Sequence, residues 1–184
     1  MRASTRQVDG VTIVDLSGHI TLDEGSTLLR DTIKQLAGQG QKHVLLNLSE
    51  VQYIDSSGIG ELVNAFTTMR DQGGELKLFN LTRKVHDLLQ ITKLHAVFDI
   101  KDDEASAIAS ELLPIYEASP NHQRFPGYVA LSLAKEAEHR GNSLEGKRLR
   151  ALGRRSIDYV LARLANADDR DAFAALPHNR ELMG

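Results

Sequence analysis

Hydrophobic residues along the chain follow two spacings, one typical of β-strands and the other of α-helices. Short apolar runs bounded by glycine or polar residues predict strands over residues 11–16, 44–48, 76–79 and 96–100. Between them, apolar residues recur every three or four positions and predict helices over residues 22–37, 59–72, 81–90 and 102–113. This alternation indicates an α/β fold, with a small mixed sheet of about four or five strands and helices packed on it. We expect the first strand to pair with its neighbour as an antiparallel hairpin.

Glycines and polar residues set the expected limits of these elements. Ser17 and Gly18 are expected to end the first strand. The first helix is expected to end at Gly38, and its inward face begins at Leu22. Gly73 ends the second helix in the same way. The prediction is therefore a chain of short elements joined by short turns.

The pattern changes between Pro114 and Pro126, a stretch with the composition of a linker. Acidic residues outnumber basic ones before this stretch, and basic residues slightly outnumber acidic ones after it. We therefore predict a first domain over residues 1–115 and an all-helical extension over residues 116–184.

The extension carries apolar stripes at helical spacing throughout. The first predicted helix starts at Pro126 and ends before Gly141. A second helix follows and is capped by Asn142 or Ser143. The two helices are expected to form a hairpin. A third, shorter helix is predicted over residues 168–176.

Composition narrows the class of protein. Hydrophobic residues make up 41% of the 184 positions and charged residues 26%, which is ordinary for a globular protein. Cysteine is absent, so disulfides and thiolate chemistry are excluded. The first residues lack the apolar core of a signal peptide, and no segment is apolar enough to span a bilayer. We expect a cytoplasmic protein without membrane insertion, and the net charge of −3 argues against direct nucleic-acid binding.

The sequence lacks the patterns of common catalytic and cofactor sites. Its seven histidines include no pair at i, i+4 and no carboxylate cluster with metal-site spacing. The residues around Ser56 do not match the Gly-x-Ser-x-Gly motif of a nucleophilic serine. Gly58 and Gly60 lack the companions that a dinucleotide fingerprint or a phosphate loop requires. We therefore expect neither an enzyme nor a bound metal or cofactor.

The most informative segment follows the strand over residues 44–48. Asp55, Ser56 and Ser57 place a carboxylate and two hydroxyls on a short loop where an amphipathic helix begins. The start of a helix offers unpaired backbone N–H groups and the positive end of the helix dipole, which favour an anion. A serine here is well placed for phosphorylation, so the loop is a candidate switch.

The same residues also fit a purely structural interpretation. Ser57 is a favoured helix N-cap residue. Gly58 and Gly60 suit a tight turn from strand to helix. Taken alone, the loop pattern leaves both interpretations open.

A run of basic residues in the extension is the second notable feature. An exposed, solvated helix face is the usual meaning of such a run. Docking to the acidic first domain or to an acidic partner is the main alternative, and nucleic-acid binding is a more remote one. The run consists of Lys147, Arg148, Arg150, Arg154 and Arg155.

Several short motifs follow one another in a fixed order between about residues 8 and 113. They are Leu16-Ser17-Gly18, the strand over 44–48, Tyr53-Ile54-Asp55-Ser56-Ser57-Gly58-Ile59-Gly60, Gly73-Gly74-Glu75-Leu76 and Val85-x-x-Leu88-Leu89-x-x-Thr92-x-Leu94. This order of elements and motifs resembles the STAS domain, and in particular the bacterial anti-sigma factor antagonists. The resemblance does not extend to the helical extension.

The resemblance implies a partner-switching mechanism that regulates transcription. Ser56, directly after the motif aspartate, would be the phosphoacceptor. Its partner would be a GHKL-type protein that is both anti-sigma factor and serine kinase, and that binds the unphosphorylated antagonist. Phosphorylation would end the binding, and a phosphatase of PP2C type would restore it.

The resemblance also assigns roles within the loop. Ser57 would cap the helix, Asp55 would orient the hydroxyl of Ser56, and the two glycines would let the partner approach closely. The partner-binding residues implied are Asp55, Ser57, Gly58, Ile59, Gly60, Thr21 and Asp23.

One departure from the family pattern affects the partner. The family often has Glu-Leu-Asp after the first glycine, whereas this chain has His19-Ile20-Thr21 and its nearest acids are Asp23 and Glu24.

An alternative function is a STAS subunit with a structural or regulatory role in another assembly, such as a membrane lipid-transport complex. There the same loop would dock without phosphate chemistry.

Overall fold

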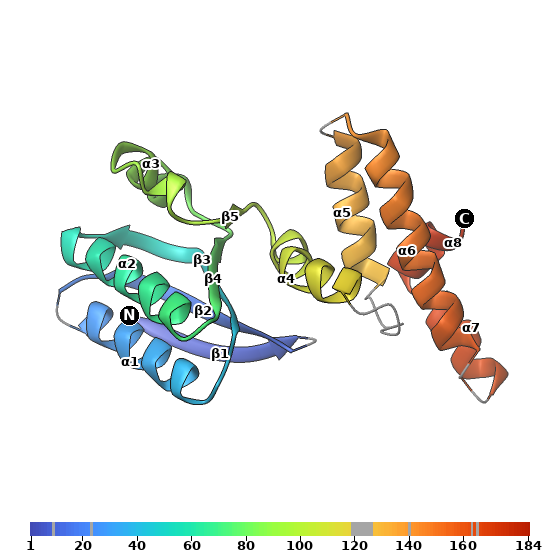
Figure 1. Ribbon diagram of the computed structural model, residues 1–184, viewed down its shortest axis with the longest axis horizontal. Coiled ribbons are helices and arrows are strands. Elements are labelled where there is room, and N and C mark those ends of the chain that lie inside the picture. Colours follow the sequence, from blue (N-terminus) through green and yellow to red (C-terminus); the bar gives the residue numbers. More distant parts are fainter. Residues whose placement is uncertain (9, 23, 119–126, 140, 163, 165) are drawn as a thin grey trace. The chain divides into compact units, whose positions relative to one another are not determined.

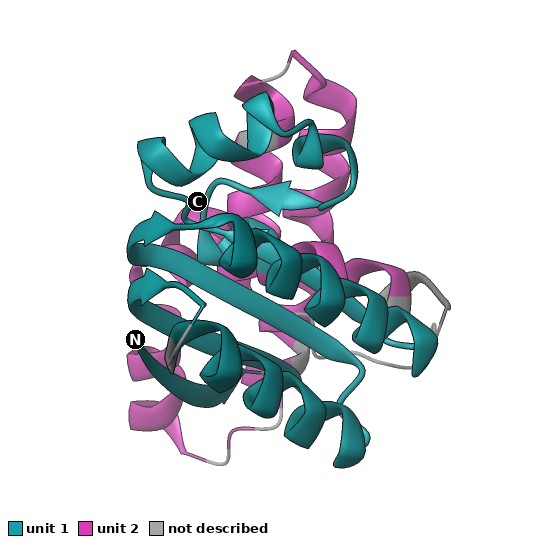
Figure 2. Cartoon of the chain, turned by 90° about the vertical axis from the view of Figure 1, so that its left-hand side faces the viewer, with its two compact units in different colours: residues 1–107 teal, residues 108–184 magenta. Residues whose placement is uncertain are grey.

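The computed structural model describes the chain except residues 9, 23, 119–126, 140, 163 and 165 (Figure 1). It divides into two compact units, Met1–Ala107 and Ile108–Gly184 (Figure 2). The division falls inside helix α4 (Glu104–Ala118), earlier than the boundary at residue 115 that the sequence predicts. Independent folding of residues 1–115 stays a prediction.

The first unit is a mixed sheet with helices packed on it, as the sequence predicts. Strand order is β1-β2-β3-β4-β5; β1 and β2 pair antiparallel and the other neighbours pair parallel. The strand predicted over residues 11–16 therefore has its antiparallel partner in β1, which was not predicted, and pairs parallel with the next predicted strand. Its elements are β1 (Arg2–Val8), β2 (Val11–Ile20), α1 (Glu24–Gly38), β3 (His43–Ile54), α2 (Ser56–Asp71), β4 (Glu75–Phe79), α3 (Arg83–Ile91), a 3-10 turn (Leu94–Ala96), β5 (Ile100–Lys101) and the start of α4.

Apolar side chains from the strands and from three helices form one core cluster. Helices α1 and α2 lie side by side against the sheet, and Val85 and Leu89 of α3 join the same core cluster. Burying one such side chain stabilises the fold by about 1.5–3 kcal/mol, so this cluster holds the unit together. Fully buried members from strands and helices include Val14, Ile20, Leu46, Leu48, Leu29, Ile33, Leu62 and Met69.

Strand β2 continues past the point where the sequence predicts its end. Gly18 adopts a φ of +95°, and the pairing register with β3 shifts on both sides of it. At both shifts the extra residue lies on β3, so Gly18 continues β2 opposite a bulged stretch of β3 instead of ending the strand. As a result, His19 and Ile20 still pair with Tyr53 and Ile54 at the far end of β3.

The strand predicted over residues 96–100 is wrong in extent. Only Ile100 and Lys101 pair with β4, and a 3-10 turn precedes them. The turn follows Lys93, which has a left-handed φ of 58°. Phe98 is nevertheless buried in the core, which explains why this stretch resembles a strand in the sequence.

The second unit consists of the rest of α4 and four further helices: α5 (Gly127–His139), α6 (Ser143–Leu161), α7 (Ala167–Ala174) and α8 (Pro177–Met183). Helices α5 and α6 form the predicted hairpin. Gly141, with a φ of +80°, precedes Asn142, whose side chain caps α6. The predicted start at Pro126 lies outside the described residues, and α8 was not predicted.

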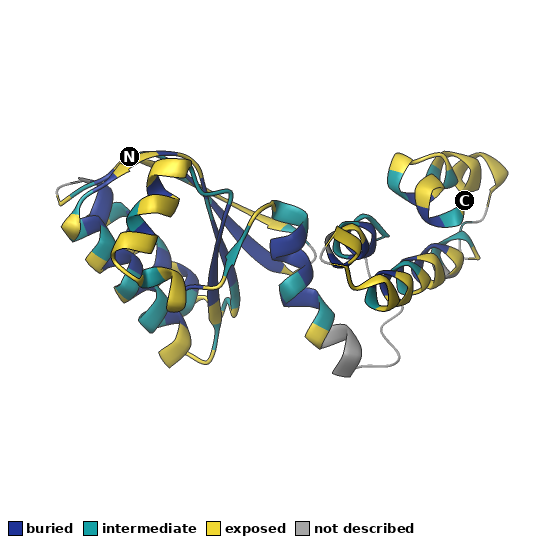
Figure 3. Ribbon diagram, turned by 90° about the horizontal axis from the view of Figure 1, so that it is seen from above, coloured by how far each residue is buried: buried dark blue, intermediate teal, exposed yellow. Residues whose placement is uncertain are grey.

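Small residues let α5 and α6 approach closely. A Cβ on Gly153 would lie 2.6 Å from the Cβ of Ala130, so this glycine has no room for a side chain. Figure 3 shows buried positions on the facing sides of these helices and exposed positions on their outer sides. The apolar stripes of the extension are thus at least partly buried within their own unit.

The basic run on α6 divides into paired and exposed residues. Arg150 binds the carboxylate of Glu138 on α5 through two hydrogen bonds of 2.9 and 3.0 Å. Lys147, Arg154 and Arg155 are exposed. A docking role for these three residues stays a prediction.

Candidate functional site

The predicted switch loop lies where β2 and β3 end and where α1 and α2 begin. Asp55 is the N-cap residue of α2: its backbone is extended, and its Oδ1 accepts a 2.8 Å hydrogen bond from the backbone N–H of Gly58. The expectation that Ser57 caps this helix is therefore wrong. The helix starts at Ser56, two positions earlier than a cap at Ser57 requires.

Asp55 also joins two loops. Its Oδ2 accepts a 3.2 Å hydrogen bond from the backbone N–H of Leu22, and its own N–H donates to the carbonyl of Ile20 at 3.2 Å. Both carboxylate oxygens thus bind backbone N–H groups from different segments. The suggested role of Asp55 in orienting the Ser56 hydroxyl stays a prediction.

Ser57 faces the neighbouring helix. Its Oγ lies 3.3 Å from the Oγ of Ser26 on α1, at hydrogen-bond distance. This contact explains why Ser57 is only partly exposed, whereas Ser56 is exposed. The structure therefore distinguishes the two adjacent serines.

The two glycines of the motif have different surroundings. A Cβ on Gly58 would lie 2.2 Å from the carbonyl oxygen of Ile20 and 2.8 Å from Cγ2 of Ile54. Gly58 is buried, so its missing side chain lets α2 approach the end of the sheet; its contact with a partner stays a prediction. A Cβ on Gly60 would meet no atom of the described chain within 4 Å, and Gly60 is exposed.

An ion pair one turn further along links the same two helices. Nη2 and Nε of Arg30 on α1 donate to Oε2 of Glu61 on α2, at 2.6 and 3.1 Å. These hydrogen bonds raise the pKa of the Arg30 guanidinium above its ordinary value. The sequence analysis missed this pair, although Glu61 stands out as an acidic residue one position before the buried Leu62. The pair fixes α1 beside α2 at the candidate site.

The remaining predicted residues contribute unequally. Thr21 is partly buried, and its carbonyl accepts a hydrogen bond from the backbone N–H of Ser26. Ile59 is partly buried against the core. Asp23 lies outside the described residues.

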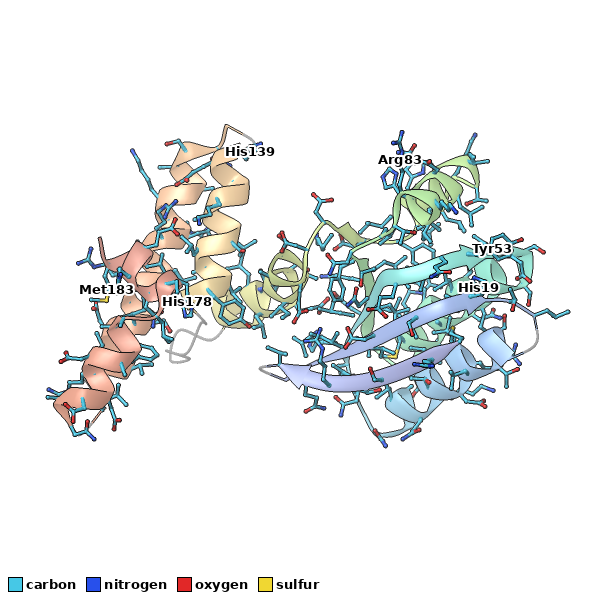
Figure 4. All side chains as sticks on the ribbon, turned by 180° about the vertical axis from the view of Figure 1, so that it is seen from behind. His19, Tyr53, Arg83, His139, His178 and Met183 are labelled. Carbon is cyan, nitrogen blue, oxygen red and sulfur yellow. The ribbon has the colours of Figure 1, made fainter. Side chains whose placement is uncertain are left out.

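Two apolar side chains that the sequence analysis did not assign to the site lie beside the loop. Leu22 is 69% exposed, contrary to its expected place on the inward face of α1, because the helix begins only at Glu24. Tyr53 is 55% exposed, and the ring of His19 packs edge-on against it, with centroids 6.1 Å apart. Figure 4 shows His19 and Tyr53 at the same end of the neighbouring strands.

The described residues form neither a metal-binding cluster nor a membrane-spanning helix. No group of three or more His, Cys, Asp or Glu side chains within them is arranged to hold a metal ion. Among the helices that these residues form, none is both long and apolar enough to cross a membrane.

Comparison with known proteins identifies the family. A sequence profile of the STAS domain matches residues 2–107, which coincide closely with the first compact unit. The anti-sigma F factor antagonist of Paenibacillus polymyxa is 28% identical over 99 residues, covering 54% of this chain and 85% of that protein. The anti-sigma-B factor antagonist of Bacillus subtilis is 37% identical over 87 residues, covering 47% and 78%.

A solved structure supports the fold. The crystal structure of an anti-sigma factor antagonist from Mycobacterium paratuberculosis matches with a TM-score of 0.52 at 18% identity, over 59% of this chain and 92% of that chain. The profile match, the sequence relatives and the arrangement of the sheet agree. The chain therefore belongs to the STAS domain family and, within it, to the anti-sigma factor antagonists.

Proposed function

We propose that this protein is the antagonist in a phosphorylation-controlled partner switch that regulates transcription. In its unphosphorylated form it binds an anti-sigma factor of GHKL type in the cytoplasm, and this binding releases the sigma factor. The same partner phosphorylates Ser56 and thereby ends the complex. A PP2C-type phosphatase returns the antagonist to its binding form. The names of the relatives support the first step, since both are antagonists of an anti-sigma factor.

The observation that carries the proposal is the difference between the two serines. Ser56 is exposed at the first residue of α2, whereas the Ser57 hydroxyl lies 3.3 Å from that of Ser26. A kinase can reach the Ser56 hydroxyl without breaking a contact between α1 and α2. Ser56 is therefore the phosphoacceptor that the geometry favours.

A phosphate on Ser56 is expected to act on the surface rather than on the fold. It adds about −1.5 to −2 charges beside the Asp55 carboxylate. The fold tolerates this charge, because a helix N-terminus favours an anion by about 0.3–1 kcal/mol. A partner bound over the loop must instead face the dianion and remove water from it, which opposes binding.

Mass spectrometry after incubation with kinase and ATP tests the phosphoacceptor directly. The full chain is incubated with the GHKL-type anti-sigma factor encoded in the same genome. One phosphate is expected on the wild type and on Ser57→Ala, and none on Ser56→Ala. Ser57→Ala is the matched control, because it removes the adjacent hydroxyl and leaves Ser56 in place.

Circular dichroism should show equal helix content in all three proteins, since the exposed Ser56 hydroxyl contributes little to stability. A phosphate on Ser57, or none on either serine of the wild type, would refute the proposed phosphoacceptor.

A further inference from the structure

Large apolar side chains are exposed at few places in the described part of the first unit, and two of them lie at the switch loop. Leu22 is 69% exposed and Tyr53 is 55% exposed. The others, Ile91 and Val97, lie at the end of α3 and after the 3-10 turn. A folded protein usually buries side chains of this size, so their exposure beside Ser56 suggests a surface that a partner covers.

Both side chains are held close to Ser56 by the backbone. The N–H of Leu22 donates to Oδ2 of Asp55, the residue that directly precedes Ser56. Tyr53 lies near the end of β3, two positions before Asp55, and the side chain of Ile54, the last residue of the strand, enters the core. Successive side chains of a strand point to opposite faces, so Tyr53 points away from the core.

The environment of Tyr53 limits its freedom before any partner binds. His19 on β2 pairs in register with Tyr53, and its ring packs edge-on against the tyrosine ring at 79°. Figure 4 shows the two side chains together at the end of the sheet. A partly ordered aromatic side chain loses little entropy on binding, which makes it an effective anchor.

We infer that Leu22 and Tyr53 are the two apolar anchors by which this protein binds its anti-sigma factor. The inference rests on the proposed function, and it names the residues that give the switch-loop surface its affinity for the anti-sigma factor. The partner must offer apolar pockets for these two side chains near the switch loop. A phosphate on Ser56 would then have to be desolvated whenever both anchors are buried, so one modification opposes the whole contact.

Isothermal titration calorimetry tests the inference. The full chain is titrated with the GHKL-type anti-sigma factor of the same genome, and ADP is present in the calorimeter cell. Leu22→Ala and Tyr53→Ala should each raise the Kd roughly tenfold or more, as truncating an interface anchor does. Leu144→Ala is the matched control, because Leu144 is 81% exposed on α6, outside the family match. Its Kd should stay within about twofold of the wild-type value.

A second pair of variants separates binding from folding. Leu22→Gln and Tyr53→His keep much of the side-chain volume, so they should melt like the wild type and still bind weakly. Equal affinity of the wild type and all anchor variants would overturn the inference and leave the proposed function intact. A wild type that neither binds this anti-sigma factor nor accepts phosphate from it would overturn the proposed function, and the inference with it.

Discussion

Replacing Gly58 by alanine tests how α2 is positioned at the end of the sheet. The added Cβ would lie 2.2 Å from the carbonyl oxygen of Ile20 and 2.8 Å from Cγ2 of Ile54. The carbonyl cannot move away freely, because it accepts a hydrogen bond from the backbone N–H of Asp55. Overpacking of this kind costs about 1–3 kcal/mol. Alanine regains at most about 1 kcal/mol over glycine within a helix, so the net effect is destabilising.

The same helix supplies the control. Gly60 lies two residues further along α2, is exposed, and its Cβ position is clear of the described chain to 4 Å. Gly60→Ala should therefore stabilise the protein by up to about 1 kcal/mol through helix propensity alone. Because the gain in helix propensity is common to both variants, we expect them to differ by about 1–3 kcal/mol in their free energy of unfolding, which is the cost of overpacking at residue 58.

Urea unfolding of the full chain, followed by far-UV circular dichroism, measures this difference. Equal midpoints for Gly58→Ala and Gly60→Ala would refute the close approach of α2 to the end of β2. Equal midpoints would also mean that packing does not require a glycine at residue 58.

Three further predictions concern the cap, the acid stability and the domain boundary. Asp55→Ala should lower the free energy of unfolding by about 1–2 kcal/mol, because it removes the α2 cap; a urea titration should show Asp55→Asn, which keeps one acceptor oxygen for the Gly58 N–H, retaining part of that stability, and equal losses would contradict the cap. The hydrogen bond from Arg6 lowers the pKa of Asp15, so this pair stabilises the fold above about pH 4, and the contribution is lost as the pH falls through the lower folded pKa. Asp15→Asn should therefore reduce the slope of stability against pH in that acid range, and an unchanged slope would count against the pair. A chain ending at residue 116 should still unfold cooperatively by calorimetry and accept phosphate on Ser56, whereas a broad, non-cooperative transition would show that folding needs the extension.

Local patterns were sufficient to predict most of the sheet and the place of the switch loop. The run at 44–48 is apolar at nearly every position because β3 lies in the middle of the sheet order. The motif after it combines a helix start with a glycine that the packing requires. Strand β1 was missed because most of its residues are exposed. It pairs only with β2, and an edge strand needs no apolar alternation to be held by backbone hydrogen bonds.

The identity of the helix cap could not be predicted from the loop alone. Aspartate and serine are comparable N-cap residues, and Asp55 and Ser57 stand two positions apart. What decides between them is the N–H of Leu22, which comes from a different loop and binds the second oxygen of Asp55. Only a carboxylate can accept from both segments at once.

Long-range pairing also explains the two errors near the start of α1. Gly18 resembles a strand end in the sequence, but β3 provides a partner on the far side of the bulge, so β2 continues to Ile20. The turn and the helix therefore begin later, and Leu22 is left exposed beside Asp55. The helical spacing of Leu22 with later leucines is real, but its position precedes the helix.

The central claim is that phosphorylation of Ser56 ends binding to the anti-sigma factor. Its most direct test is calorimetric titration of the same anti-sigma factor with unphosphorylated and fully phosphorylated protein, each verified by mass spectrometry. We expect a measurable Kd for the unphosphorylated form and at least a hundredfold weaker binding for the phosphorylated form, roughly the loss expected when a charged group opposes a buried contact. Equal affinity of the two forms would contradict it.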